Sequence, residues 1–224
     1  MTARGRFLTV EGGEGVGKST NIEFLCSLIR DHGFEVQMTR EPGGTPTAER
    51  IRDLLLEHFD EPMPDLAELL LFFAARTLHV ENVIRPALAR GTWIVCDRFT
   101  DATRAYQGTG RGLDARLIEQ LAAWVHGDLS PDLTLLLDAP PEVGRGRAER
   151  RGDADRLEGE QAAFHARVRE GYLALANREP GRFRVIDAGK PLDQVQADIE
   201  KALRHLWDPA AESRFAADAT TPRK

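Results

Sequence analysis

A glycine-rich segment near the start of the chain places the strongest constraint on its fold. Residues 12–19 read GGEGVGKS and match the pattern GxxxxGK[ST] in full. The apolar run Phe7–Val10 precedes this segment, and Ile22, Leu25 and Ile29 form a helical stripe after it. A strand, a glycine turn and a helix in this order predict a loop whose backbone N–H groups surround the phosphates of a nucleoside triphosphate.

The residue types within the motif suit this chemistry. Glycines allow the backbone to curl around an anion, and the positive end of the next helix faces it. Lys18 would bring a full charge to the β and γ phosphates, and the Ser19 hydroxyl would ligate Mg²⁺. A glycine turn with a chance lysine is the alternative. The expected nucleotide-binding residues are Gly12, Gly13, Glu14, Gly15, Val16, Gly17, Lys18, Ser19 and Thr20.

The rest of the chain alternates strand-like and helix-like segments. Further strands are predicted at residues 36–39, 93–96, 133–137 and 183–186. Helices are predicted at residues 47–59, 66–90, 113–125 and 192–206, and a long helix is predicted to follow residue 156 and to end at about residue 177. This alternation predicts an α/β P-loop NTPase fold, with a five-stranded parallel sheet flanked by helices on both faces. We expect one domain over residues 1–207, a lid near 145–158 and a disordered tail over 208–224.

Composition and missing motifs exclude several classes of protein. The net charge of −6 disfavours non-specific binding to nucleic acid, so a bound anion must be held by arginines gathered in one place. No apolar stretch approaches the ~20 residues of a membrane span, and residues 1–6 lack signal-peptide features. Cys26 and Cys96 are too few for a disulfide framework and fit a reducing cytoplasm. The sequence also lacks the DxxG and NKxD motifs of GTPase switches.

Asp97 and Arg98 directly follow the predicted third strand. Because the carboxyl ends of parallel strands face the ligand crevice of such a sheet, the aspartate is expected to orient the water shell of Mg²⁺. The adjacent arginine would then face an acceptor phosphate. A surface ion pair after the strand is the alternative.

The helix predicted over residues 66–90 carries Phe72 and Arg76 on one side face, about 100° from its expected core stripe. A flat ring beside a guanidinium suits a base and its polar edge, whereas a broad apolar face is the alternative. The expected core stripe consists of Leu66, Leu69, Leu70, Phe73 and Thr77.

A cluster of arginines lies between residues 145 and 156. In a mobile lid, such arginines would neutralise charge on a transferring phosphoryl group. Interleaved acidic residues leave a solvated ion-pair surface as the alternative. The cluster consists of Arg145, Arg147, Arg150, Arg151 and Arg156.

Taken together, these features resemble the thymidylate kinase family over residues 7–207. The loop GGEGVGKST and the block LFFAAR belong to this resemblance, and two features are specific to the family: the block TREPGGT, and Asp97-Arg98 followed by AYQG. The matching segments are residues 12–20, 39–45, 71–76, 97–98, 105–108, 131–133, 137–138 and 155–158.

The resemblance implies roles for the acceptor site. Phe72 would stack on thymine, and Arg76 and Gln107 would hold the polar edge of the base. Arg98 would contact the acceptor phosphate, with Arg52 as a further candidate, and Tyr106 would disfavour a ribose 2′-hydroxyl. Ala102 stands where the family often has serine, so its neighbour Thr103 is a candidate for bonding the base. The substrate-binding set is Arg40, Pro42, Arg52, Phe72, Arg76, Arg98, Thr103, Tyr106 and Gln107.

The resemblance also implies roles around the donor. Glu14 would help to place the acceptor, and Arg147 would lie against the adenine. Arg151 and Arg156 would act from the lid, while Ser19 and Asp97 would hold Mg²⁺, partly through water. The catalytic set is Lys18, Glu14, Asp97, Arg98, Arg151 and Arg156.

The implied reaction is in-line phosphoryl transfer from ATP to dTMP, which gives ADP and dTDP. Asp97 would position the metal rather than abstract a proton, because a phosphate monoester is already largely ionised near neutral pH. The family further implies a homodimer, and the cysteine content favours a cytoplasmic location. Two alternatives are a kinase for another monophosphate or a deoxynucleoside, and a non-catalytic nucleotide-binding module.

Overall fold

A computed structural model describes residues 4–140, 142–144 and 156–207. Its centre is a five-stranded sheet in the order β2-β3-β1-β4-β5, and each neighbouring pair is parallel. This confirms the predicted fold class. The strands are β1 (Phe7–Glu11), β2 (Val36–Arg40), β3 (Trp93–Asp97), β4 (Leu133–Asp138) and β5 (Phe183–Asp187).

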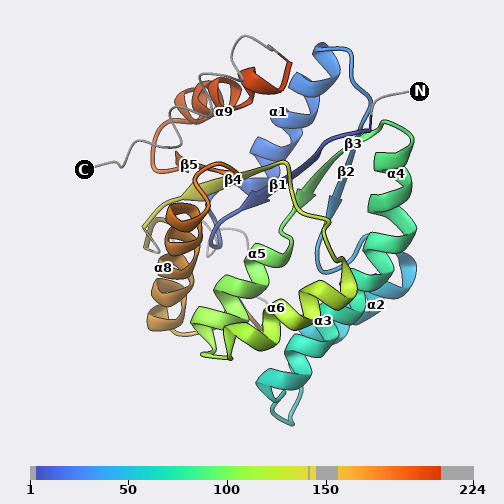
Figure 1. The fold of residues 1–224 in the computed structure, drawn as a ribbon. Helices are drawn as coiled ribbons and strands as arrows, with labels where there is room; N and C mark the ends of the chain where they lie inside the picture. Colours follow the sequence, from blue (N-terminus) through green and yellow to red (C-terminus); the bar gives the residue numbers. More distant parts are fainter. Residues whose placement is uncertain (1–3, 141, 145–155, 208–224) are drawn as a thin grey trace.

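Two helices cover one face of the sheet (Figure 1). Helix α1 (Lys18–Asp31) begins at the end of the glycine loop, and α9 (Leu192–Trp207) packs beside it. Their apolar stripes, including Leu25 and Ile199, share a core with Leu8, Leu135 and Ile186 from the strands. Because β1 and α1 are both packed in this core, the two ends of the glycine loop between them are fixed in position.

The opposite face carries the remaining helices (Figure 1). Helix α2 starts where the Thr45 hydroxyl accepts the Ala48 N–H at 3.2 Å, and Pro46 occupies the first turn. These helices are α2 (Pro46–Leu56), α3 (Asp65–His79), η1 (Val80–Ile84), α4 (Arg85–Ala89), α5 (Thr100–Thr103), η2 (Arg104–Gly110), α6 (Ala115–Val125) and α8 (Ala162–Arg178).

The helix predicted over residues 66–90 is a continuous run of α3, the π-helical segment η1 and α4. Its predicted core stripe is partly wrong: Leu69 and Phe73 are buried, but Leu66 and Leu70 are 50% and 49% exposed. The buried side of α3 instead includes Glu68, since ion pairs and hydrogen bonds satisfy its charge there. Hydrophobicity alone therefore misplaced the inner face of this helix.

The segment after β3 forms α5 and η2, which the sequence pattern did not predict. The π-helical η2 packs against α8 and carries Tyr106 and Gln107 to the sheet edge where β1 and β3 end. Residues 145–155 and 208–224 lie outside the described residues, as do Arg145, Arg147, Arg150 and Arg151 of the predicted lid. The predicted disordered tail likewise falls in the part that is not described.

Candidate active site

The glycine loop follows β1 and closes onto the first turn of α1. Gly12, Gly15 and Gly17 have φ angles of 139°, 67° and 87°, which glycine adopts far more readily than other residues. A Cβ atom at Gly12 would lie 2.4 Å from the Leu137 carbonyl oxygen, so the close approach of β4 also requires glycine. Val16 is buried in the core with α1 and anchors the middle of the loop.

Lys18 is buried at the start of α1 and bends back over the loop. Its Nζ donates to the Gly13 carbonyl oxygen at 2.8 Å. Burial lowers the pKa of Lys18, as does Arg98, while Glu14 acts in the opposite direction. The ammonium thus lies where an incoming phosphate would replace weak carbonyl contacts with charged ones.

Asp97 and Ser19 offer oxygen atoms that could ligate Mg²⁺. Asp97 ends β3, and its buried Oδ1 has no hydrogen-bond partner among the described residues. Ser19 lines the same pocket as Asp97. A carboxylate oxygen and a hydroxyl are ligands that suit Mg²⁺, which usually keeps several waters and takes further oxygens from phosphates. These residues therefore fit the metal.

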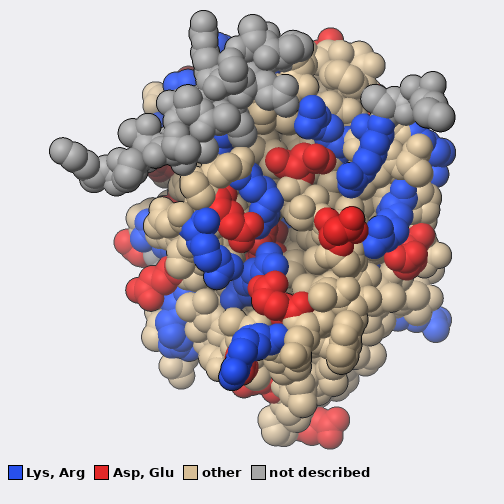
Figure 2. All heavy atoms as spheres, in the orientation of Figure 1, with Lys and Arg blue, Asp and Glu red and all other residues tan. Residues whose placement is uncertain are grey.

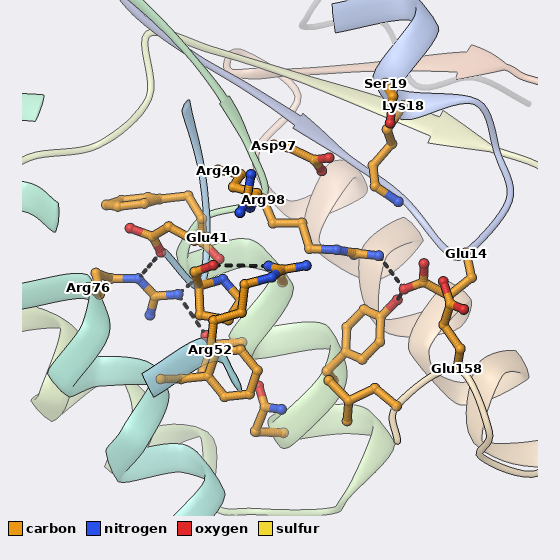
Figure 3. Close-up of a pocket in the computed structure, with 18 of the residues that line it drawn as sticks. Glu14, Lys18, Ser19, Arg40, Glu41, Arg52, Arg76, Asp97, Arg98 and Glu158 are labelled. Carbon is orange, nitrogen blue, oxygen red and sulfur yellow. Dashed lines mark hydrogen bonds and ion pairs between the residues drawn. The ribbon is translucent and has the colours of Figure 1, made fainter. Parts of the chain in front are cut away.

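A pocket of about 620 Å³ opens beside the loop (Figure 3). It brings together residues from the carboxyl ends of β1, β2 and β3 and from α3, α5 and η2. Most of the residues expected from the sequence line it: Glu14, Gly15, Gly17, Lys18, Ser19, Thr20, Arg40, Pro42, Arg52, Phe72, Arg76, Asp97, Arg98, Thr103, Tyr106 and Gln107.

Arg98 lies between the loop and the rest of the pocket. Its guanidinium pairs with Glu14 and donates to the Gly12 carbonyl oxygen at 2.8 Å and the Tyr172 hydroxyl at 3.1 Å. The Tyr106 hydroxyl donates to Glu14 at 2.8 Å, and the Tyr106 ring lies 4.9 Å from the guanidinium carbon. Burial alone would raise the pKa of Glu14, but Arg98, Lys18 and Tyr106 lower it to about 2.

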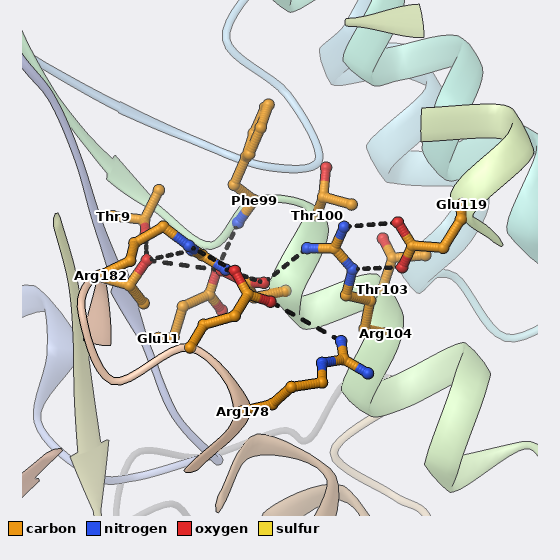
Figure 4. Close-up of polar contacts among 12 residues, drawn as sticks. Thr9, Glu11, Phe99, Thr100, Thr103, Arg104, Glu119, Arg178 and Arg182 are labelled. Atoms are coloured by element: carbon orange, nitrogen blue, oxygen red, sulfur yellow. Dashed lines mark hydrogen bonds and ion pairs between the residues drawn. The ribbon is translucent and has the colours of Figure 1, made fainter. Parts of the chain in front are cut away.

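Glu11 binds the backbone of Phe99, the residue that follows Arg98 (Figure 4). Arg98 has a φ of 67° and is the one non-glycine residue with positive φ in the described ranges. The Phe99 N–H donates to Glu11 at 2.7 Å, and the Tyr172 hydroxyl donates to the other Glu11 oxygen at 2.8 Å. Burial and the nearby Asp101 raise the pKa of Glu11 to about 8. Both the turn and the guanidinium of Arg98 therefore depend on Glu11.

Arg76 lies at the far end of the pocket, where it forms a buried ion pair with Glu41 at 2.6 Å. Its Nη2 donates to the Phe99 carbonyl oxygen and, at 3.0 Å, to the Thr103 hydroxyl. Its Nη1 is buried and has no partner within the described part of the chain. A buried donor without a partner is costly, so this end of the pocket suits a ligand acceptor such as a base carbonyl.

Arg40, the last residue of β2, and Arg52, in the middle of α2, both line the pocket. Arg40 pairs with Glu49 at 2.7 Å, and Arg52 donates to the Pro42 carbonyl oxygen at 2.9 Å. Both side chains lie on the side of the pocket opposite the glycine loop (Figure 3). The pocket thus has cationic groups on two sides, with Phe72 from α3 in its lining.

Arg156 is the one predicted lid arginine within the described residues, and it does not line this pocket. It donates to the Leu55 carbonyl oxygen at 2.9 Å and to Glu68 at 2.6 Å, at the base of the segment that follows residue 155. Leu157 and Glu158, which come next, do reach the pocket.

Sequence reasoning missed Glu41, Tyr172 and Glu68. Glu41 lies inside the block TREPGGT, and that block was the available signal for it. Tyr172 stands in the middle of α8 and contacts Glu11, which is 161 positions away in the chain. Glu68 resembles any surface helix acid in the sequence, although it is fully buried. No local pattern marks the last two.

A phosphate loop at the carboxyl edge of a parallel sheet, next to a cationic pocket with an aromatic side chain, defines a P-loop nucleotide kinase. The family model for thymidylate kinase matches residues 10–199. The chain is 58% identical to the thymidylate kinase of Methylococcus capsulatus over 195 residues, which cover 87% of this chain and 93% of that protein. It is 60% identical to the thymidylate kinase of Chromohalobacter salexigens over 197 residues, with coverage of 87% and 93%.

A solved structure agrees with these sequence comparisons. The crystal structure of thymidylate kinase from Ehrlichia chaffeensis has a TM-score of 0.74 and 33% identity, and the match covers 90% of this chain and all of that one. The chain belongs to the thymidylate kinase family.

Proposed function

We propose that this protein transfers the γ-phosphoryl group of ATP to dTMP, which gives ADP and dTDP. The main support is the shared pocket, in which the phosphate loop and the far end with Arg76, Phe72 and Gln107 face one cavity. Family membership supports the same reaction. A donor phosphate at the loop and a pyrimidine at the far end would place the acceptor phosphate between them, near Arg98.

Charge neutralisation and positioning carry the proposed mechanism. Donor and acceptor are both anions, and their approach is unfavourable until cations offset the repulsion. Lys18 holds the donor phosphates and Arg98 the acceptor phosphate, while Glu14 fixes the guanidinium of Arg98. A general base is unnecessary because the acceptor oxygen is already ionised at neutral pH.

Mg²⁺ is the proposed cofactor, held by Ser19 and Asp97, partly through water. The unpartnered Oδ1 of Asp97 supports this assignment. When bound, the ion would neutralise charge on the donor phosphates. Asp97 would orient the hydration shell of the ion, and the Ser19 hydroxyl would contribute an oxygen ligand.

The predicted lid remains part of the proposal. Arg147 would lie against the adenine, and Arg151 would approach the transferring group. Arg156 would act at the base of the lid, where its bond to Glu68 holds the chain. We propose a single domain over residues 1–207 with this lid near 145–158.

A coupled ADP-release assay with ATP and Mg²⁺ tests the function. Wild-type protein should release ADP rapidly with dTMP and much more slowly with UMP and thymidine. The rate with dUMP, which lacks only the 5-methyl group of dTMP, measures how much that group contributes to the rate. Lys18→Ala serves as the control for a contaminating kinase. Equal rates with UMP and dTMP would favour a kinase for another monophosphate, and ATP binding without ADP release would favour a non-catalytic module.

We also propose that the protein is a cytoplasmic homodimer that acts on small molecules. Cys26 and Cys96 are free and buried, which suits a reducing compartment. None of the helices in the described part of the chain combines the length and hydrophobicity needed to cross a bilayer. On the face shown in Figure 2, basic and acidic side chains lie intermixed, unlike the basic stripe of a nucleic-acid-binding surface.

Leu66 and Leu70 on α3 and Trp124 on α6 support the dimer. They are 50%, 49% and 80% exposed, and the two helices pack against each other through Leu69, Phe73, Ile118 and Ala122. Exposed apolar side chains on adjacent helices suit an interface between copies of the chain.

A further inference from the structure

Glu68 is a buried carboxylate where the substrate pocket meets the segment after residue 155. Its side chain on α3 is fully buried and accepts hydrogen bonds from three side chains. Gln107 Nε2 donates at 2.8 Å, Arg111 Nη2 at 3.1 Å and Arg156 Nη2 at 2.6 Å. Burial would raise the pKa of Glu68, but these donors lower it overall, so the group stays ionised and can only accept hydrogen bonds.

This arrangement fixes the orientation of the Gln107 side chain. An amide has one donor group and one acceptor oxygen, and only the donor group can face a carboxylate. The amide nitrogen therefore points to Glu68, and the oxygen is left for the pocket that Gln107 lines. Gln107 is 1% exposed, so a reversed amide would place two oxygens against each other in a buried site.

Arg76 supplies the complementary group. It has donors only, and its Nη1 is the one left without a described partner. The pocket thus offers a donor from Arg76 and an acceptor from Gln107. A pyrimidine with a 4-oxo group and an N3–H matches this pattern, whereas a 4-amino pyrimidine presents a donor and a lone pair in their place.

We propose that Glu68 is a positioning residue that fixes the Gln107 oxygen toward the base and thereby selects 4-oxo over 4-amino pyrimidine nucleotides. This inference rests on the proposed function. Glu68 does not touch the base, since it acts through Gln107. Its other bonds, to Arg111 and Arg156, hold the carboxylate in place.

Two substitutions of Glu68 separate orientation from stability. Glu68→Gln is nearly isosteric but can donate as well as accept, so the Gln107 amide becomes free to turn over. Glu68→Asp shortens the side chain but keeps an acceptor-only group. Arg111→Gln is the matched control, because it removes bonds to Glu68 and Glu160 while Gln107 keeps its partner.

The measurement is kcat and KM for dTMP and dCMP at saturating ATP, with unfolding curves for each protein. In Glu68→Gln, the ratio of kcat/KM for dTMP to that for dCMP should fall by about 10-fold or more, mainly through KM. Glu68→Asp and Arg111→Gln should retain the wild-type ratio even where stability falls.

An unchanged ratio in Glu68→Gln would overturn the inference, as would an equal loss in Arg111→Gln, because Glu68 would then only support the fold. Wild-type protein that fails to turn over dTMP would instead overturn the proposed function. The two failures are therefore distinguishable.

A measurement on the wild type covers the case in which Glu68→Gln does not fold. The side-chain amide signals of Gln107 can be assigned by NMR with Gln107→Met. The proton that is bonded to Glu68 should exchange slowly with solvent in the free protein and shift little when dTMP binds. If both amide protons exchange fast, or both shift strongly with dTMP, the amide has the reverse orientation and the inference is contradicted.

Discussion

Arg98 combines a strained backbone with a guanidinium that three neighbouring residues hold in place. A positive φ at a non-glycine residue costs of order 1 kcal/mol or more and persists only where surrounding contacts impose it. Here Glu11 accepts the next N–H, and Glu14, Gly12 and Tyr172 bind the side chain. The guanidinium is therefore held in place in the free protein, as its proposed role at the acceptor phosphate requires.

Phe72→Ala should weaken dTMP binding. Phe72 lines the pocket and belongs to an apolar cluster with Leu55 and Leu157, and we propose that its ring stacks on the base. Stacking of a base on an aromatic ring contributes ~1–3 kcal/mol, which corresponds to a rise of roughly 5- to 150-fold in the KM for dTMP. The KM for ATP should stay close to that of wild type.

The control for Phe72 is Leu69→Val on the same helix. Leu69 is buried between α3 and α6 and does not line the pocket. This variant should lose stability without a change in the KM for dTMP. A Phe72→Ala enzyme with wild-type KM would place Phe72 in the core alone.

Glu14 should make stability depend on pH on the acid side. Its pKa is about 2 in the folded protein against a reference value of 4.5, so the unfolded chain binds the proton more tightly. The stabilisation is complete above pH 4.5 and is lost as the pH falls from 4.5 toward 2. The shift corresponds to about 3 kcal/mol.

Urea unfolding of wild type and Glu14→Gln at pH 6, 4.5 and 3 measures this effect. The difference in unfolding free energy between the two proteins should shrink as the pH falls through this range. A constant difference would mean that Glu14 is not held ionised by Arg98 and Lys18.

At the level of helices, the contact of α8 with η2 requires glycine at position 171. Alanine favours a helix over glycine by about 1 kcal/mol, so propensity alone predicts that Gly171→Ala stabilises α8. A Cβ there would lie 2.9 Å from the Thr109 Cβ and 3.3 Å from the Ala105 Cα. Overpacking costs about 1–3 kcal/mol and should therefore exceed the gain.

Urea denaturation of Gly171→Ala should show lower stability than wild type. Gly181→Ala is the matched control, because nothing lies within 4 Å of a Cβ at that position. The control should be neutral. A stabilised Gly171→Ala would mean that α8 and η2 are packed less closely than the structure indicates.

At the scale of the whole molecule, we expect the exposed apolar side chains of α3 and α6 to form the dimer interface. Leu70→Glu should place a charge in the proposed dimer interface and give a monomer by size-exclusion chromatography with light scattering. Leu192→Glu is the control: Leu192 is 51% exposed on α9, which covers the opposite face of the sheet. A dimeric Leu70→Glu, or a wild-type monomer, would contradict the interface.

The sequence predicted the sheet class, the glycine loop between β1 and α1, and the place of Asp97 and Arg98 at the end of β3, because these features depend on residues close together in the chain. Strand periodicity and the spacing of Gly12, Lys18 and Ser19 are local signals. The pocket lining followed from family blocks and agrees with the structure for Phe72, Arg76 and Gln107, although their proposed roles await the assays above.

The partners of the charged side chains emerged only in three dimensions. Glu41 meets Arg76 across 35 positions, Arg98 meets Glu14 across 84, and Arg156 meets Glu68 across 88. Burial of an acid such as Glu68 is favourable only when distant donors converge on it, so hydrophobicity along the chain placed the inner face of α3 incorrectly. Short-range sequence pattern thus predicts the proposed phosphate loop, whereas contacts between distant residues set the orientation of the charged groups that line the pocket.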